Sequence, residues 1–206
     1  QPGEEVGNCV ADILTGKVCP SGKLPMTWPI DVMDHPSSKH FPITAEGNDK
    51  VCLYKEGINV GYRYFETAGK PVSYPFGYGL SYGKVAYGNA TVTKLPTKHS
   101  PMTVSVDLSN DGNMPIDEVV QVYLSTPSAG VTSPIESLVA FKRVKIAPHA
   151  TVTTDFEIPV ERLETVQEDG TSKLLKGEYR VMISGAAPCN RSKELGVSCS
   201  TATFKL

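Results

Sequence analysis

The sequence predicts a mainly β protein whose larger part is an antiparallel β-sandwich, preceded by a shorter portion that mixes helix and strand. Three observations carry this prediction: short runs of alternating apolar and polar residues after residue 83, turn-forming residues between those runs, and a helical periodicity confined to the start of the chain. A chain of 206 residues can form one or two domains with a full core.

The first expected element is a short amphipathic helix near the start of the chain. Glu4 and Glu5 stand where a first turn would place carboxylates at the positive end of the helix dipole, and Gly16 is placed to end the helix. The segment "KLPMTWP", residues 23–29, has too many prolines for a helix and predicts a short strand or extended segment. The expected helix carries one apolar stripe of Val6, Cys9, Val10, Ile13 and Leu14.

Residues 29–53 mix Pro, Asp, His, Ser and Gly with few apolar repeats, which predicts a surface loop. A lone helix and strand cannot bury their apolar faces on each other, because stable layers need a second packed element. The first part of the chain must therefore pack against something else. For the helix stripe we expect either the sandwich, reached through the aromatic segment that follows, or a second copy of the chain.

The rest of the chain is rich in Val, Thr, Ile, Tyr and Phe, with turn sequences such as "NDGN" and "EDGTSK" between the apolar runs. Seven short strands at this spacing are typical of a two-sheet sandwich of the immunoglobulin or fibronectin type III kind. The fibronectin type III form is favoured, because Trp28 lies far upstream and no cysteine separates Cys52 from Cys189. The seven runs are 84–95, 102–110, 117–126, 136–146, 150–158, 177–185 and 200–206.

Composition excludes two classes of partner. Twenty basic and twenty-two acidic residues give a net charge of −2, which offers no field for a nucleic acid backbone or an anionic membrane surface. No apolar run is long enough to span a membrane.

The five cysteines contain no C-x-x-C pair, which argues against a structural zinc site. Cys189 and Cys199 are the one candidate disulfide, because two neighbouring strands could bring them together across a polar stretch. The alternative is two buried or free thiols.

No group of side chains has the spacing of a catalytic or metal site. The acidic residues of 159–170 predict a solvated turn between strands, since nothing nearby would desolvate one carboxyl and raise its pKa. No G-x-S-x-G elbow appears, so a nucleophilic serine has no anchor. The histidines lack the short paired spacing of metal ligands; they are His35, His40, His99 and His149.

Three stretches in register resemble consecutive motifs of one enzyme family: "PGEEVGNCVADILTGKVCPSGKLPMTWP", "YKEGINVGYRYFET" and "PVSYPFGYGLSYG". They are similar to motifs of three-domain glycoside hydrolase family 3 enzymes of the β-glucosidase and β-xylosidase type. The resemblance implies that the chain is a C-terminal fragment of such an enzyme. Residues 1–53 would be the end of its α/β-sandwich domain, 54–83 a linking segment, and 84–206 a fibronectin type III-like domain.

The same resemblance places the chemistry outside this chain. The family's nucleophilic Asp belongs to a (β/α)8 barrel domain, and its proton-donating Glu lies in the α/β-sandwich domain before the first motif. Glu4 and Glu5 match a helix-start motif instead of that acid, so no catalytic residue is assigned here, and no substrate-binding residue, metal or cofactor. The expected partners are the missing barrel and α/β domains and a β-linked glycoside substrate, and family habit implies secretion or a periplasmic location.

We expect residues 54–83 to be an interdomain joint rather than an active site. Six of the nine tyrosines fall there, and rings with one polar edge suit a segment wedged between domains. Arg63 is expected to stack on a ring or to bind a carboxylate across the interface. The joint residues that we single out are Tyr62, Arg63, Tyr64, Phe65 and Tyr78.

Two functional hypotheses follow. In the first, the chain is the non-catalytic tail of an exo-acting, retaining glycosidase, with β-glucosidase favoured over β-xylosidase by the "VGYRYF" form of the motif. In the second, the sandwich is a carbohydrate-binding or adhesion module. Such modules present rows of exposed aromatic rings, whereas the few aromatics after residue 83 lie mostly in alternating runs where burial is the default.

Overall fold

The computed structural model describes residues 3–39, 54–128 and 133–206, and strands dominate them. This confirms the mainly β class. The elements are α1 (Val6–Leu14), β1 (Trp28–Pro29), η1 (Val32–Asp34), η2 (Pro36–Lys39), α2 (Tyr62–Thr67), β2 (Val72–Tyr74), β3 (Val85–Tyr87), β4 (Thr91–Lys94), β5 (Met102–Asn110), β6 (Ile116–Ser125), β7 (Ser137–Ile146), β8 (Ala150–Ile158), η3 (Val160–Arg162), β9 (Thr165–Val166), β10 (Ser172–Lys173), β11 (Glu178–Ser184), α3 (Asn190–Glu194) and β12 (Cys199–Lys205).

Two antiparallel sheets form the sandwich. One has the order β12-β11-β6-β7. In the other, β8 pairs with the whole of β5, so β3 and β4 share the opposite edge of β5, β3 opposite residues 108–110 and β4 opposite residues 103–105. The expected single strand 84–95 is therefore two strands, because the chain leaves the ladder around Gly88 and Ala90, where the Ala90 N–H bonds to the Ser200 hydroxyl instead.

The inner faces of the two sheets meet in one apolar core. Alternate residues of each strand supply it, among them Val120 and Val122 on β6 and Leu108 on β5, all fully buried. Tyr179, at the start of β11, is fully buried too, and its hydroxyl donates a 2.8 Å hydrogen bond to the carbonyl of Leu175. A tyrosine bonded back to the chain just upstream is the corner that fixes many immunoglobulin-like sandwiches.

The N-terminal portion matches the prediction in outline. Helix α1 ends where Gly16 adopts φ +75°, but Glu4 and Glu5 precede its first turn instead of forming it. Strand β1 pairs with β2, a partner that the sequence patterns did not indicate. Part of the predicted loop 29–53 forms the 3₁₀ turns η1 and η2, and the rest of it, residues 40–53, lies outside the described residues.

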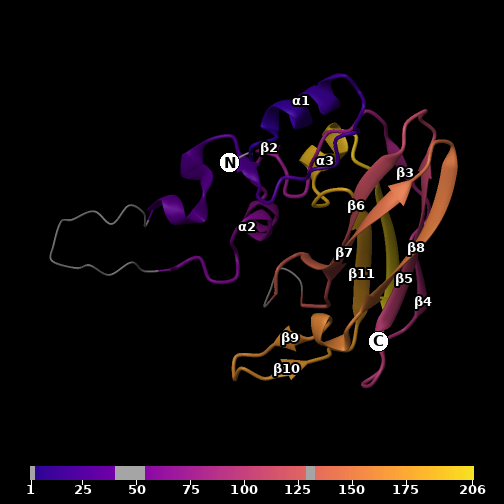
Figure 1. Ribbon diagram of the computed structural model, residues 1–206. Coiled ribbons are helices and arrows are strands. Elements are labelled where there is room, and N and C mark those ends of the chain that lie inside the picture. Colours follow the sequence, from indigo (N-terminus) through magenta and orange to yellow (C-terminus); the bar gives the residue numbers. More distant parts are fainter. Residues whose placement is uncertain (1–2, 40–53, 129–132) are drawn as a thin grey trace.

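Residues 62–67 form helix α2, which the sequence did not predict. The stretch 159–170 contains a turn as expected, the 3₁₀ turn η3, but it is followed by strand β9 of an unexpected short hairpin with β10. Figure 1 shows α1, α2 and β2 gathered on one side of the sandwich, with the β9–β10 hairpin far from α1 at its other end. Within the described ranges, no helix has the length and apolarity needed to cross a bilayer.

Candidate functional site

Tyr62 on α2 is the centre of the contact between the aromatic segment and the sandwich. Its ring stacks on Phe76 (centroids 5.1 Å apart, planes at 26°) and meets the buried ring of Tyr123 on β6 edge-on (5.8 Å, 84°). Its hydroxyl accepts a 2.8 Å hydrogen bond from the backbone N–H of Leu138 on β7. The apolar cluster around this contact consists of Tyr62, Phe76, Tyr123, Leu138, Met182 and Ala187.

This cluster covers the outer face of the sheet. Neighbouring residues of β6 point to opposite faces, so Val122 and Leu124 enter the inner core while Tyr123 between them faces the aromatic segment. The second half of β6 is consequently buried on both faces. Each aromatic pair of this kind contributes about 0.5–1.5 kcal/mol beyond area burial.

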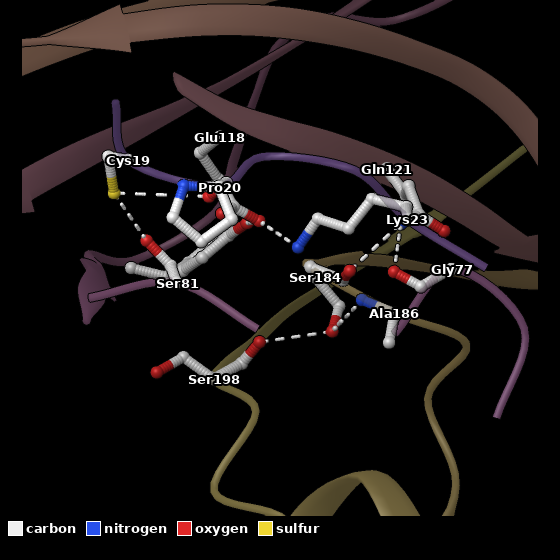
Figure 2. Close-up of polar contacts among 12 residues, drawn as sticks. Cys19, Pro20, Lys23, Gly77, Ser81, Glu118, Gln121, Ser184, Ala186 and Ser198 are labelled. Carbon is white, nitrogen blue, oxygen red and sulfur yellow. Dashed lines mark hydrogen bonds and ion pairs between the residues drawn. The ribbon is translucent and has the colours of Figure 1, made fainter. Parts of the chain in front are cut away.

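Gln121 ties the same face to the backbone of the segment. Its buried side-chain amide donates hydrogen bonds to the carbonyls of Gly77 (3.2 Å) and Gly185 (2.9 Å), and its oxygen accepts from the Tyr123 hydroxyl (2.6 Å). Figure 2 shows Gln121 reaching Gly77 beside the chain that carries Ser184 and Ala186. Burial and the nearby groups raise the pKa of Tyr123, so its hydroxyl stays protonated and can donate. The network therefore leaves no buried amide group of Gln121 unpaired.

The extended segment before β1 is bound to the aromatic segment backbone to backbone. The N–H of Leu24 donates to the carbonyl of Tyr78 (2.8 Å), and the N–H of Gly77 donates to the carbonyl of Leu24 (2.9 Å). At Gly79, a β-carbon would lie 2.2 Å from the carbonyl oxygen of Gly22. Glycine is required there because the two backbones approach too closely for any side chain.

One ion pair crosses from this extended segment to the sandwich. The Lys23 ammonium lies 3.0 Å from Oε1 of Glu118 on β6, and the Tyr87 hydroxyl donates to the same oxygen at 3.1 Å. Burial, and then the Glu118 charge, raise the pKa of Tyr87 well above its usual range. Figure 2 shows the Lys23–Glu118 pair next to the Cys19–Ser81 contact. Three segments of the chain therefore meet at one polar patch: residues 19–23, the aromatic segment at Ser81, and β6.

Arg63, Tyr64 and Phe65 complete the helix. The Arg63 guanidinium lies 5.9 Å from the centre of the Tyr62 ring, which is a cation–π contact. Phe65 is buried and has two edge-on neighbours, Tyr64 at 5.3 Å and His35 at 5.6 Å. These contacts link α2 to the 3₁₀ turns of the N-terminal portion.

Tyr78 contacts that portion as well. Its ring stacks on Tyr74 (5.6 Å, 15°), and Tyr74 meets Trp28 edge-on (6.1 Å, 75°). The described part of residues 54–83 thus touches the sandwich through Tyr62 and the N-terminal portion through Phe65 and Tyr78. This is the geometry that a joint requires, and its role between the domains of a whole enzyme stays a prediction.

The candidate disulfide does not form. Cys189 is buried and Cys199 is exposed, and both are free thiols. Cys189 instead caps helix α3, where its sulfur accepts the N–H of Ser192. A helix begins between the two positions, so they do not face each other as the ends of adjacent strands would.

Two carboxyl groups that the sequence did not single out have raised pKa values. Burial raises the pKa of Glu66 on α2 to about 7, and burial together with the Glu66 charge raises the pKa of Glu136, just before β7, to about 8. Glu4 and Glu5 are exposed. In the solvated turn, hydrogen bonds from Thr171 lower the pKa of Asp169.

A cavity of about 860 Å³ lies beside α2. Its polar lining includes Glu66, Lys70, Arg191 and Glu194, with charges of both signs.

Among the residues that the structure describes, no three His, Cys, Asp or Glu side chains converge as metal ligands would. His40 lies outside those residues, and His149 contacts Asn113 at 2.9 Å.

Sequence reasoning singled out Tyr62 and its neighbours because rings and glycines cluster in one stretch. It missed the partners on the sandwich, among which Gln121 and Tyr123 are both buried. The available signal was "VVQVYL", residues 119–124, which is apolar at most positions of both faces instead of one.

Two family models match the chain. The glycosyl hydrolase family 3 C-terminal domain matches residues 1–82, and the fibronectin type III-like domain matches residues 118–187. Together they cover both the N-terminal portion and the centre of the sandwich.

Relatives of known sequence are much longer than this chain. A β-glucosidase of Rhizobium radiobacter is 35% identical over 187 residues, which are 90% of this chain and 23% of that protein. Thermostable β-glucosidase B of Acetivibrio thermocellus is 39% identical over 157 residues, 76% of this chain and 20% of that protein. The chain therefore spans roughly a quarter or less of the length of these relatives.

Solved structures agree in fold. β-Glucosidase 3B of Thermotoga neapolitana superposes with a TM-score of 0.85 at 34% identity, covering 100% of this chain and 27% of that one. A family 3 β-glucosidase of Bifidobacterium adolescentis gives 0.83 at 31% identity, covering 97% and 28%. The chain belongs to glycoside hydrolase family 3 and corresponds to the C-terminal portion of that family's longer members.

Proposed function

We propose that this chain is the C-terminal, non-catalytic part of an exo-acting β-glucosidase that releases β-linked glucose from non-reducing ends with retention of configuration. Its own role is structural: it holds the end of an α/β domain against a self-sufficient sandwich. The observation that carries this proposal is the joint around Tyr62, in which one short segment packs against both portions through aromatic rings and backbone hydrogen bonds.

The acids of such a mechanism would come from other domains. Retention needs two carboxyl groups about 5 Å apart, one to attack the anomeric carbon and one to protonate the leaving oxygen. Glu66 and Glu136 have raised pKa values, but both lie where α2 meets the sandwich, and Glu136 is only 3% exposed. Glu136 is therefore out of reach of a sugar ring, and Glu66 alone, although it lines the cavity, cannot supply the pair of carboxyl groups.

The apolar surface of the N-terminal portion supports the presence of further domains. In α1 no residue is buried, and Val6, Val10 and Leu14 are 40%, 48% and 77% exposed. The helix therefore does not bury its stripe on the sandwich. We propose that the remainder of the α/β domain, in the same longer protein, covers this face, because exposed apolar patches of this kind mark interaction surfaces.

The carbohydrate-binding alternative has less support. Of the sandwich aromatics, Tyr123, Phe156, Tyr179 and Phe204 are buried and Tyr87 is half-buried, which leaves Phe141 as the one exposed ring among these described strands. One ring does not make the row on which a polysaccharide stacks.

The test is a comparison of two proteins on aryl β-glucosides and aryl β-xylosides. We expect the 206-residue chain alone to give no turnover above buffer, and a longer protein carrying the upstream domains to hydrolyse the glucoside faster than the xyloside. Turnover by the chain alone would contradict the structural role. A longer protein that prefers the xyloside would support the β-xylosidase alternative instead.

We also propose that the protein is secreted or periplasmic, which fractionation of the native host would check.

A further inference from the structure

Glu136 is a buried carboxyl group with an unpaired oxygen. The residue is 3% exposed, and its Oε1 has no hydrogen-bond partner within the described part of the chain. An ionised carboxylate is stable inside a protein only when donors surround its oxygens or a cation neutralises it. The surroundings of Glu136 therefore favour the neutral acid.

Glu66 brings a second carboxyl group to the same junction. It follows Tyr62 by one helical turn of α2, so both side chains lie on the same face of the helix, and Tyr62 bonds to Leu138 two residues after Glu136. Glu66 is half-buried and lines the cavity of about 860 Å³. Burial raises the pKa of both carboxyls, and the Glu66 charge raises that of Glu136 further.

The other groups around the two carboxyls oppose this effect only in part. Arg180 on β11 lowers the pKa of Glu136, and the Cys189 thiol before α3 lowers that of Glu66. The Tyr123 hydroxyl on β6 and the Cys189 thiol are also close enough to be affected by these carboxyls, and burial raises the pKa of both, which keeps them neutral. The charged groups that share the cavity with Glu66 are Lys70, Arg191, Lys193 and Glu194.

We propose that the protonation of Glu66 and Glu136 controls whether helix α2 stays packed against the sandwich. When both carboxyls are neutral, Tyr62 remains packed against β6 and β7. When they ionise, two negative charges are held together in a poorly solvated junction, and α2 detaches to hydrate them. This device goes beyond the structural role of the joint, because it makes the strength of the joint depend on pH.

The direction in which the stability of the joint changes with pH follows from the linkage between proton binding and opening of the joint. Both carboxyls have pKa values above the reference of 4.5, so the folded junction binds protons more tightly than the open one. The stabilisation is complete below pH 4.5 and is lost as the pH rises through about 7 for Glu66 and about 8 for Glu136. The joint is thus strongest in acid and weakest in mild alkali.

Hydrogen–deuterium exchange of α2 and of the Leu138 amide tests the proposal on the 206-residue chain. After correction for intrinsic exchange, we expect protection to fall about tenfold or more between roughly pH 6 and pH 9. Glu136→Gln and Glu66→Gln should each flatten this dependence, and the double variant should abolish it. Glu161→Gln, in the exposed η3 turn, is the matched control and should behave as the wild type.

Carboxyl ¹³C titration of the wild-type chain provides a second measurement that does not depend on any variant folding. We expect two glutamate signals to titrate near or above neutrality and to disappear in Glu66→Gln and Glu136→Gln respectively. Protection that does not change with pH, a double variant that keeps the wild-type dependence, or all glutamates titrating below about pH 5 would each overturn the proposal.

Discussion

The side-chain amide of Gln121 donates a hydrogen bond to the carbonyl of Gly77 at a point where the two residues touch so closely that Gly77 has no room for a β-carbon. Such an atom would lie 2.2 Å from Oε1 of Gln121. Gly77 also adopts φ +76°, a left-handed conformation that favours glycine. Two independent constraints therefore fix glycine at the point where the aromatic segment meets β6.

Gly77→Ala should destabilise the chain more than its backbone conformation alone explains. The left-handed conformation costs about 1–2 kcal/mol for a residue with a β-carbon, and displacement of Gln121 adds about 1–3 kcal/mol of overpacking. Gly69→Ala is the control, because Gly69 has φ +60° but open space around it. Urea unfolding measures both variants, and equal losses of stability would show that the contact with Gln121 carries no weight.

Tyr62→Phe should lower the free energy of unfolding by about 1–3 kcal/mol, because the N–H of Leu138 loses its partner while the ring contacts remain. Tyr64→Phe removes the equivalent hydroxyl group, but the Tyr64 hydroxyl makes no hydrogen bond to any residue in the described ranges. It should change stability by less than about 0.5 kcal/mol. If the two variants melt at the same temperature, Tyr62 does not anchor α2 through its hydroxyl.

The Lys23–Glu118 pair should show measurable coupling in a double-mutant cycle built from Lys23→Met and Glu118→Gln. The two side chains are 17% and 11% exposed, so solvent screens them little, and we expect about 1–3 kcal/mol. The Lys17–Asp12 pair, 73% and 36% exposed at the same 3.0 Å, should give about 0–1 kcal/mol. Coupling as weak in the first pair as in the second would mean that this bridge does not hold residues 19–24 to β6.

Tyr179→Phe should destabilise the sandwich by about 1–3 kcal/mol, because the carbonyl of Leu175 loses the only side-chain donor seen for it among the described residues. The stacked ring of Phe204, 5.2 Å away, stays in contact, so the loss reports the hydroxyl alone. Thermal unfolding followed by far-UV circular dichroism measures it. Tyr54→Phe, at a site 89% exposed, should leave the melting temperature unchanged.

The strands could be predicted because the sandwich has one core and its strands alternate toward it. β5 and β8 show this simple pattern, and their nine-residue ladder follows the predicted runs 102–110 and 150–158. Helix α1 was predictable for the same reason, since its apolar residues share one side although nothing in the described chain buries them.

The joint could be predicted only from one side. A cluster of rings and glycines marks residues 54–83. The burial of Gln121 and Glu136, however, depends on which distant part of the sequence covers the outer face of β6 and β7, and local patterns do not reveal this. The pairing of Cys189 with Cys199 failed for a related reason. Of the nine residues between them, Asn190–Glu194 form helix α3 with Cys189 as its cap, a local structure that a strand-to-strand interpretation excludes.

The most direct test of the joint compares two unfolding curves of one sample. Trp28 is the sole tryptophan and reports on the N-terminal portion through its contact with Tyr74, whereas far-UV circular dichroism reports on the sheets. If the aromatic segment fastens the two portions together, fluorescence and circular dichroism should show coincident urea transitions, and Gly77→Ala should shift the fluorescence transition to lower urea than the sheet transition. A wild-type Trp28 signal that is lost while the sheets remain intact would contradict the account.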